Sequence, residues 1–89
     1  MTTTADIPDS EGPEILHLDL RGLKCPLPVL HTRKALARAT PGTRLVVRCT
    51  DPMAAIDIPH LAHETGDVLE HKSLENGEFT FRLLRRPQP

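Results

Sequence analysis

One cysteine of the chain has neighbours that suit thiol chemistry. Cys25 lies in the run GLKCPLP, residues 22–28, between an apolar strand pattern and a helical pattern. A thiol at the mouth of a helix faces the partial positive charge of the helix N-terminus, which favours the thiolate. We therefore expect the pKa of Cys25 to lie below its usual value, with adjacent Lys24 acting in the same direction.

Two prolines follow this thiol and limit the chemistry that it can do. Pro26 and Pro28 fix the backbone and remove two N–H groups, which leaves the amide of Leu27 as the nearest donor to the sulfur. Pro28 stands where a C-x-x-C motif has the second cysteine that resolves a mixed disulfide. An adduct on Cys25 would therefore persist until a thiol of another protein attacked it. The pattern predicts a thiol that holds a group and hands it on.

The second cysteine and the histidines give weaker signals. Cys49 alternates with apolar residues on one face of a strand pattern, which predicts a packed thiol, and a resolving partner for Cys25 is the alternative. His60 and His63 are three residues apart, but no third residue has the spacing of a metal ligand. We expect neither a metal site nor a cofactor.

The charges are sorted along the chain, although the net charge of its 89 residues is only −1. Residues 21–48 hold seven basic and no acidic side chains, whereas residues 49–81 hold seven acidic side chains and one lysine. Two interpretations stay open. The charges are ordinary solvated faces, or they create a positive field near Cys25 that steers an acidic partner. On the second interpretation, the candidate partner-binding residues are Lys24, Arg33 and Lys34.

The hydropathy pattern predicts four strands and two helices. The strands are expected at residues 15–20, 43–49, 68–74 and 78–84, the last two joined by a tight hairpin at Asn76-Gly77. The first helix is expected to begin with Pro26 at its first position and to run to about residue 39. The second is expected to have Asp51 as its cap, to end at Gly66, and to be kinked or broken near Ile58 by Pro59.

The order β-α-β-α-β-β predicts an α+β fold. A right-handed first crossover gives a two-layer sandwich, in which a four-stranded mixed sheet has both helices on one face. Both helix N-termini then emerge at the same sheet edge, where Cys25, Cys49 and Asp51 converge. Asp57 is interpreted either as a solvated helix charge or as an ion-pair partner of the basic segment.

The length of the chain allows one small domain. We expect a disordered N-terminal segment at residues 1–13, a single domain at residues 14–85 and a flexible tail at residues 86–89. No stretch approaches the length of a membrane span, and the N-terminus lacks a signal pattern. We expect a cytoplasmic monomer, because a reducing compartment suits one reactive thiol.

Motifs spread over residues 15–84 combine into a specific pattern. They are Asp19, the run GLKCPLP at 22–28, Arg33-Lys34, Pro41-Gly42, Thr50-Asp51-Pro52 and Asp57-Ile58-Pro59. With them the chain resembles the TusA/SirA family of small sulfur-carrier proteins. The resemblance implies a fold similar to the C-terminal domain of bacterial initiation factor three. It also implies a persulfide relay by thiol exchange, in which Cys25 accepts sulfur from a cysteine desulfurase and passes it to an acceptor protein.

In related proteins the relay leads to tRNA thiolation, molybdenum cofactor maturation or sulfur oxidation. This chain departs from the family pattern at two positions that are candidates for altered partner choice. Asp67 stands where a histidine is common, and Leu61 where an aromatic residue is common. Two other functions stay open: a thiol redox protein using Cys25 and Cys49, and an RNA- or protein-binding module. The missing C-x-x-C motif argues against the first. Few aromatics and near-neutral charge argue against direct nucleic-acid contact.

Overall fold

The computed structural model describes residues 15–87, so the segment expected to be disordered at residues 1–13 lies outside the described part. Four strands and two helices follow one another in the predicted order. They are β1 (Ile15–Leu20), α2 (Leu27–Arg38), β2 (Arg44–Cys49), α3 (Ala54–Thr65), β3 (Val68–Glu75) and β4 (Glu78–Leu84). The predicted α+β arrangement is confirmed.

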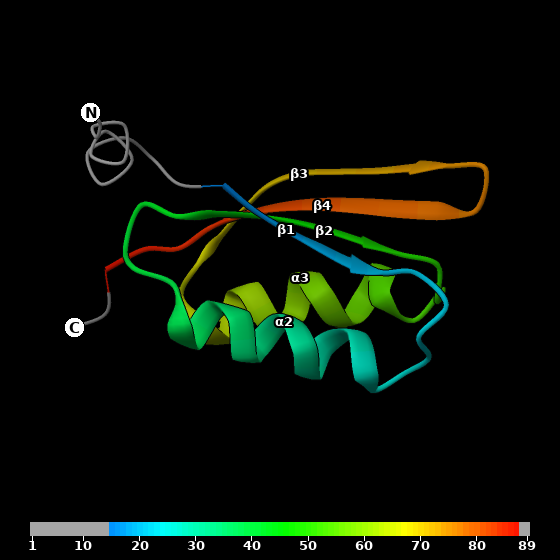
Figure 1. Cartoon of the computed structure of the whole chain (residues 1–89), viewed down its shortest axis with the longest axis horizontal. Helices are drawn as coiled ribbons and strands as arrows, with labels where there is room; N and C mark the ends of the chain where they lie inside the picture. Colours follow the sequence, from blue (N-terminus) through cyan, green and yellow to red (C-terminus); the bar gives the residue numbers. More distant parts are fainter. Residues whose placement is uncertain (1–14, 88–89) are drawn as a thin grey trace, which may run out of the picture.

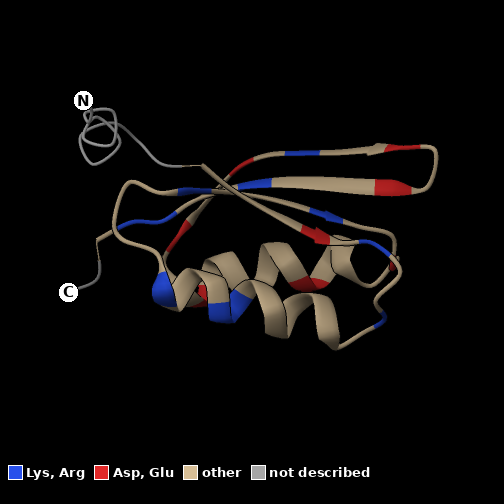
Figure 2. Cartoon of the chain, viewed as in Figure 1, with Lys and Arg blue, Asp and Glu red and all other residues tan. Residues whose placement is uncertain are grey.

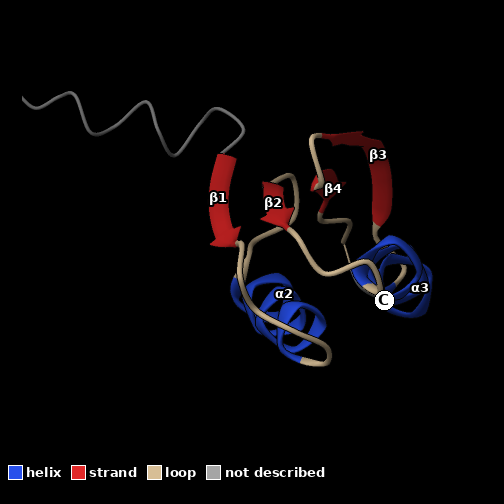
Figure 3. Cartoon of the chain, turned by 90° about the vertical axis from the view of Figure 1, so that its right-hand side faces the viewer, coloured by secondary structure: helices blue, strands red, loops and turns tan. Residues whose placement is uncertain are grey.

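The strands form one mixed sheet in the order β1-β2-β4-β3. Strand β1 is parallel to β2, and the pairs β2–β4 and β3–β4 are antiparallel. Both helices lie against the same face of this sheet, which leaves the other face open (Figure 1 and Figure 3). Because β1 and β2 are parallel neighbours, Leu20 lies beside Cys49 and the loops that follow the two strands leave the sheet at one edge.

An aliphatic core fixes the helices on the sheet. Burying one such side chain contributes about 1.5–3 kcal/mol. The largest fully buried apolar side chains are Leu36 of α2, Leu45 and Val47 of β2, Ile58 and Leu61 of α3, and Phe81 and Leu83 of β4. The ring of Phe79 stacks on that of Phe81, with 6.1 Å between the ring centroids. The alternating buried apolar residues of β2 and β4 therefore form the surface of the sheet against which both helices pack.

Helix α2 begins one residue later than predicted. Pro26 occupies the cap position rather than the first helical position, and the helix starts at Leu27. The reason is a tight turn immediately before the helix, in which the amide of Leu27 donates to the carbonyl of Lys24 over 2.8 Å. The first helical bond then runs from Leu30 to the carbonyl of Pro26, over 3.1 Å.

Helix α3 differs from the prediction at its start and in its middle. Met53, not Asp51, is the cap residue, because a turn whose Ala54 amide donates to the Asp51 carbonyl precedes the helix. The break expected near Ile58 does not occur, and α3 continues through Pro59. Proline removes one helical hydrogen bond, and the buried residues on either side of it hold the helix against the sheet. Each helix has twelve residues, and within residues 15–87 neither is long and apolar enough to cross a membrane.

Candidate functional site at the carboxyl ends of two parallel strands

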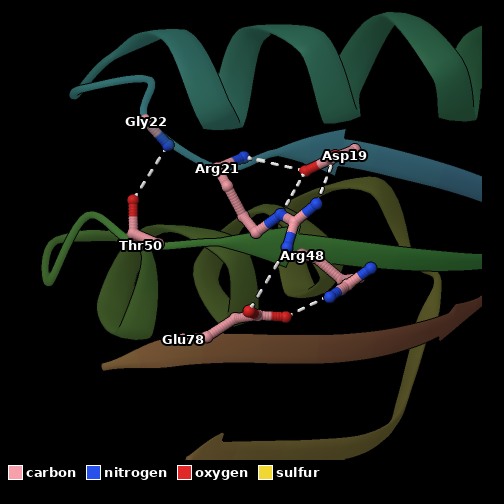
Figure 4. Close-up of polar contacts among 6 residues, drawn as sticks. All are labelled: Asp19, Arg21, Gly22, Arg48, Thr50 and Glu78. Atoms are coloured by element: carbon pink, nitrogen blue, oxygen red, sulfur yellow. Dashed lines mark hydrogen bonds and ion pairs between the residues drawn. The ribbon is translucent and has the colours of Figure 1, made fainter. Parts of the chain in front are cut away.

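Two loops at the edge of the sheet are tied together by hydrogen bonds. The amide of Cys25 donates to Oδ2 of Asp51 over 2.6 Å. The amide of Gly22 donates to Oγ1 of Thr50 over 2.9 Å (Figure 4). Gly22 has a φ of 88°, a value that residues with a Cβ rarely adopt. The loop after β2 thus holds the loop after β1, and the structure brings Cys25 and Asp51 together as the sequence predicts.

The sulfur of Cys25 is exposed and lies close to a carboxylate. Its Sγ is 3.7 Å from Oδ2 of Asp57, which comes from the first turn of α3. At this distance the thiol donates a weak hydrogen bond to the carboxylate. Within residues 15–87 Asp57 makes no ion pair, so its interpretation as a partner of the basic segment is wrong. It is a direct neighbour of the thiol.

The predicted acidity of Cys25 is wrong in direction. Desolvation by the surrounding chain and the carboxylates of Asp57 and Asp51 raise the pKa of the Cys25 thiol. The amide of Leu27, which was expected to support the sulfur, is engaged by the Lys24 carbonyl instead. With two of the first N–H groups absent and two carboxylates nearby, the charge of the helix start does not determine the titration.

The charges that are sorted along the sequence pair in space. Arg21, Arg33, Arg44 and Arg48 of the basic segment each contact a carboxylate. Figure 2 shows that basic and acidic positions both occur on the helices and on the strands of the folded chain. The closest contacts are Arg21–Asp19 at 2.7 Å, Arg33–Glu64 at 3.0 Å, Arg44–Glu70 at 2.8 Å and Arg48–Glu78 at 2.7 Å. Figure 4 shows Arg21 turned toward Asp19 and Glu78, along the open side of the sheet. The charged groups that change the pKa of Cys25 are the carboxylates of Asp57 and Asp51, so the basic segment does not favour its thiolate as expected.

Cys49 has a different environment, although it lies at the same edge. It is fully buried, which confirms the predicted packed thiol, and both cysteines are free. Desolvation, with a smaller contribution from Asp51, raises the pKa of Cys49 to about 11. A buried thiol that stays protonated is a poor nucleophile. Only Cys25 presents a sulfur to another protein.

Comparison with known proteins places the chain in a family. A family model described as sulfurtransferase TusA matches residues 16–85. The chain belongs to the TusA family. A Neisseria meningitidis protein named "Putative sulfur carrier protein" is 46% identical over 63 residues, which are 71% of this chain and 85% of that protein. The sulfur carrier protein TusA of Allochromatium vinosum is 41% identical over 68 residues, which are 76% of this chain and 90% of that protein. The resemblance inferred from the motifs is confirmed.

The remaining predicted site residues of this TusA-family chain occupy distinct places. Pro26 is exposed beside the thiol, and Pro28 is buried against the core. Exposed Lys24 directly precedes Cys25. Arg33 and Lys34 lie about 9 Å or more along the axis of α2 from its first residue. Among the described residues, the basic side chains of this segment without an ion pair are Lys24, Lys34 and Arg38.

The two departures from the TusA pattern are interior features. Leu61 is 1% exposed and belongs to the core. Asp67, 8% exposed, accepts hydrogen bonds from Thr65 over 2.5 Å and from Arg85 over 2.9 Å. Both residues act on the packing of the domain, so neither offers a side chain to a docking partner.

Sequence reasoning missed exposed apolar side chains at the starts of the two helices. Four large side chains in the first turns and caps of the two helices are 42–65% exposed: Leu27, Leu30, Met53 and Ile56. The sequence could have indicated them, because they are apolar residues that lie outside the buried stripe of each helix. Within residues 15–87, no group of three potential metal ligands exists, and Nε2 of His60 lies 3.6 Å from the carboxylate of Glu64.

Proposed function

We propose that this chain is a sulfur carrier, in which Cys25 accepts sulfane sulfur from a cysteine desulfurase and passes it to a thiol of an acceptor protein. The observation that carries the proposal is the contrast between its two thiols: Cys25 is exposed in a loop held by Asp51, whereas Cys49 is fully buried. Membership of the TusA family supports the same role. The name of the Allochromatium vinosum relative, a sulfur carrier, supports it as well.

The chemistry of the relay consists of two thiol exchanges. In the first, the Cys25 sulfur attacks the outer sulfur of a persulfide on the donor. A new S–S bond forms at Cys25, the S–S bond of the donor breaks, and the donor cysteine leaves as a thiolate that takes up a proton. In the second, an acceptor thiolate attacks the outer sulfur on Cys25 and Cys25 is the leaving thiolate. Neither step requires an oxidant, a reductant or a cofactor.

The arrangement of the site explains why the persulfide would persist. Pro28 occupies the position of a resolving cysteine, and its backbone is held by Thr32, whose Oγ1 donates to the Pro28 carbonyl over 2.8 Å. The other thiol of the chain is buried in the core. The sulfur on Cys25 would thus stay bound until a thiol of another protein attacks it, and a carrier needs this property.

Docking of the donor and the acceptor would use the surface around Cys25. Exposed Lys24 and Lys34 make no ion pair among the described residues and are the contacts we propose for acidic partner groups. Arg33 forms an ion pair with Glu64, so Arg33 can bind a partner only if this exposed pair opens. Exposed pairs of this kind contribute about 0–1 kcal/mol, so opening costs little.

Intact-mass analysis tests the proposal. The chain is incubated with a cysteine desulfurase and cysteine, with and without a final treatment with reductant. Wild type and Cys49→Ala should each gain one sulfur atom that reductant removes, and Cys25→Ser should gain none. Equal sulfur gain by Cys25→Ser would overturn the assignment of Cys25.

A further inference from the structure

The contact between Cys25 and Asp57 has a consequence for how the thiol is activated. The 3.7 Å separation of Sγ and Oδ2 places the carboxylate where a thiol proton can be shared and where a thiolate would be repelled. Asp57 is half-buried on the first turn of α3 and makes no ion pair among the described residues. No cationic side chain of residues 15–87 therefore pairs with its negative charge, which leaves the carboxylate to a cation from another protein.

The other charged groups at this edge do not offset Asp57. Asp51, from the loop before α3, is also acidic and accepts the amide of Cys25. Arg21, from the loop before Cys25, is held by Asp19 and Glu78. Lys24 directly precedes Cys25 in the same loop, but it is exposed and makes no ion pair with Asp57. In agreement with this geometry, desolvation and then Asp57 and Asp51 raise the pKa of the Cys25 thiol.

We propose that Asp57 keeps Cys25 protonated in the free protein, and that a lysine or arginine of the sulfur donor activates the thiol by pairing with Asp57. This inference rests on the proposed function of Cys25 as the sulfur acceptor. Once the cation has paired with Asp57, the thiol releases its proton to solvent and the thiolate attacks the outer sulfur of the donor persulfide. Asp57 is thus a positioning residue that makes sulfur uptake depend on the correct partner.

The apolar surroundings of the site favour a protein as the source of the cation. Leu27 and Leu30 from α2, and Met53 and Ile56 beside and within α3, are exposed around the two helix starts. A partner that covers these side chains reduces the exposure of the Asp57 carboxylate to water. An ion pair gains strength as the effective dielectric constant falls, so docking and activation reinforce one another. A small cation in solution lacks this advantage.

Alkylation of the full chain tests the first half of the proposal without any sulfur chemistry. The rate of Cys25 modification by iodoacetamide is measured as a function of pH for wild type, Asp57→Asn and Asp57→Glu. Removal of the charge should raise the rate near neutral pH by about threefold or more, and glutamate should restore a slow rate. The matched control is Glu64→Gln, which makes the same charge change two turns further along α3 and should match wild type. Equal pH profiles for Asp57→Asn and wild type would overturn the proposal.

Sulfur uptake from two donors tests the second half. Glutathione persulfide, a small donor without a cationic docking surface, should load Asp57→Asn about threefold or more faster than wild type. A cysteine desulfurase should load the same variant about threefold or more slowly, because the pairing site is lost. Faster loading of Asp57→Asn by both donors would overturn the role of a partner cation. If wild type takes sulfur from neither donor, the proposed function fails, whereas the alkylation profile still decides whether Asp57 restrains the thiol.

Discussion

Cys25 lies in the loop after β1 and Cys49 is the last residue of the neighbouring parallel strand β2, and both are affected by the same carboxylate, yet they occupy opposite environments. Asp51 contributes to raising the pKa of both thiols, and desolvation is the largest cause for each. Cys25 lies in an exposed loop, whereas Cys49 is enclosed by the core on the inner face of β2. The direction of the pKa shift is therefore the same for the two thiols. Exposure separates them, and the two loops that hold Cys25 at the surface are what make it available.

The largest expected difference between the two thiols is their reactivity in the native state. Iodoacetamide at neutral pH without denaturant should modify Cys25 about 100-fold or more faster than Cys49, because Cys49 reacts only when the core opens. Mass spectrometry of tryptic peptides separates the two sites. Similar rates for both cysteines would show that Cys49 is accessible and would revive it as a resolving thiol.

The next largest effect concerns the side chain that holds the Cys25 loop. Asp51→Ala leaves the Cys25 amide without its acceptor, and should lower the free energy of unfolding by about 1–3 kcal/mol. Urea unfolding followed by circular dichroism measures this change.

Asp51→Asn is the matched variant, because it keeps an acceptor oxygen and loses the charge. It should recover part of the free energy that the alanine variant loses. Wild-type stability for Asp51→Ala would mean that the 2.6 Å contact does not hold the loop.

The smallest expected effect is a pH dependence that belongs to the buried thiol. The raised pKa of Cys49 means that its contribution to stability is complete below its ordinary pKa and is lost as pH rises toward about 11. The loss is at most about 1.36 kcal/mol per pH unit. Between about pH 9 and 11, the free energy of unfolding should fall less steeply for Cys49→Ala than for wild type. Parallel curves would show that Cys49 titrates alike in the folded and unfolded chain.

The sequence predicted the framework because the framework depends on local patterns. The alternating apolar residues of β2 predicted that strand, and the Asn76-Gly77 turn predicted the hairpin of β3 and β4. Both turn residues have the positive φ expected of a tight hairpin, 50° for Asn76 and 77° for Gly77. The position of Cys25 between a strand and a helix was also readable, as was burial of Cys49.

The electrostatics of the site could not be predicted in the same way. The direction of the Cys25 titration depends on Asp57, which is 32 residues away in the sequence and reaches the sulfur only through the packing of α3. The basic segment gave a misleading signal, because four of its five arginines are paired with carboxylates, such as Glu64 and Glu70 from later elements. The charges of residues close in the sequence therefore do not predict which charges lie close to the Cys25 sulfur in the fold.

Locating the transferred sulfur tests the central claim most directly. Wild-type chain loaded by a cysteine desulfurase is capped with iodoacetamide and digested with trypsin, which places Cys25 and Cys49 on separate peptides, residues 25–33 and 49–72. The account predicts the additional sulfur on the peptide of Cys25 and none on the peptide of Cys49. Sulfur on the peptide of Cys49, or on neither peptide of a chain whose intact mass has increased, would contradict it.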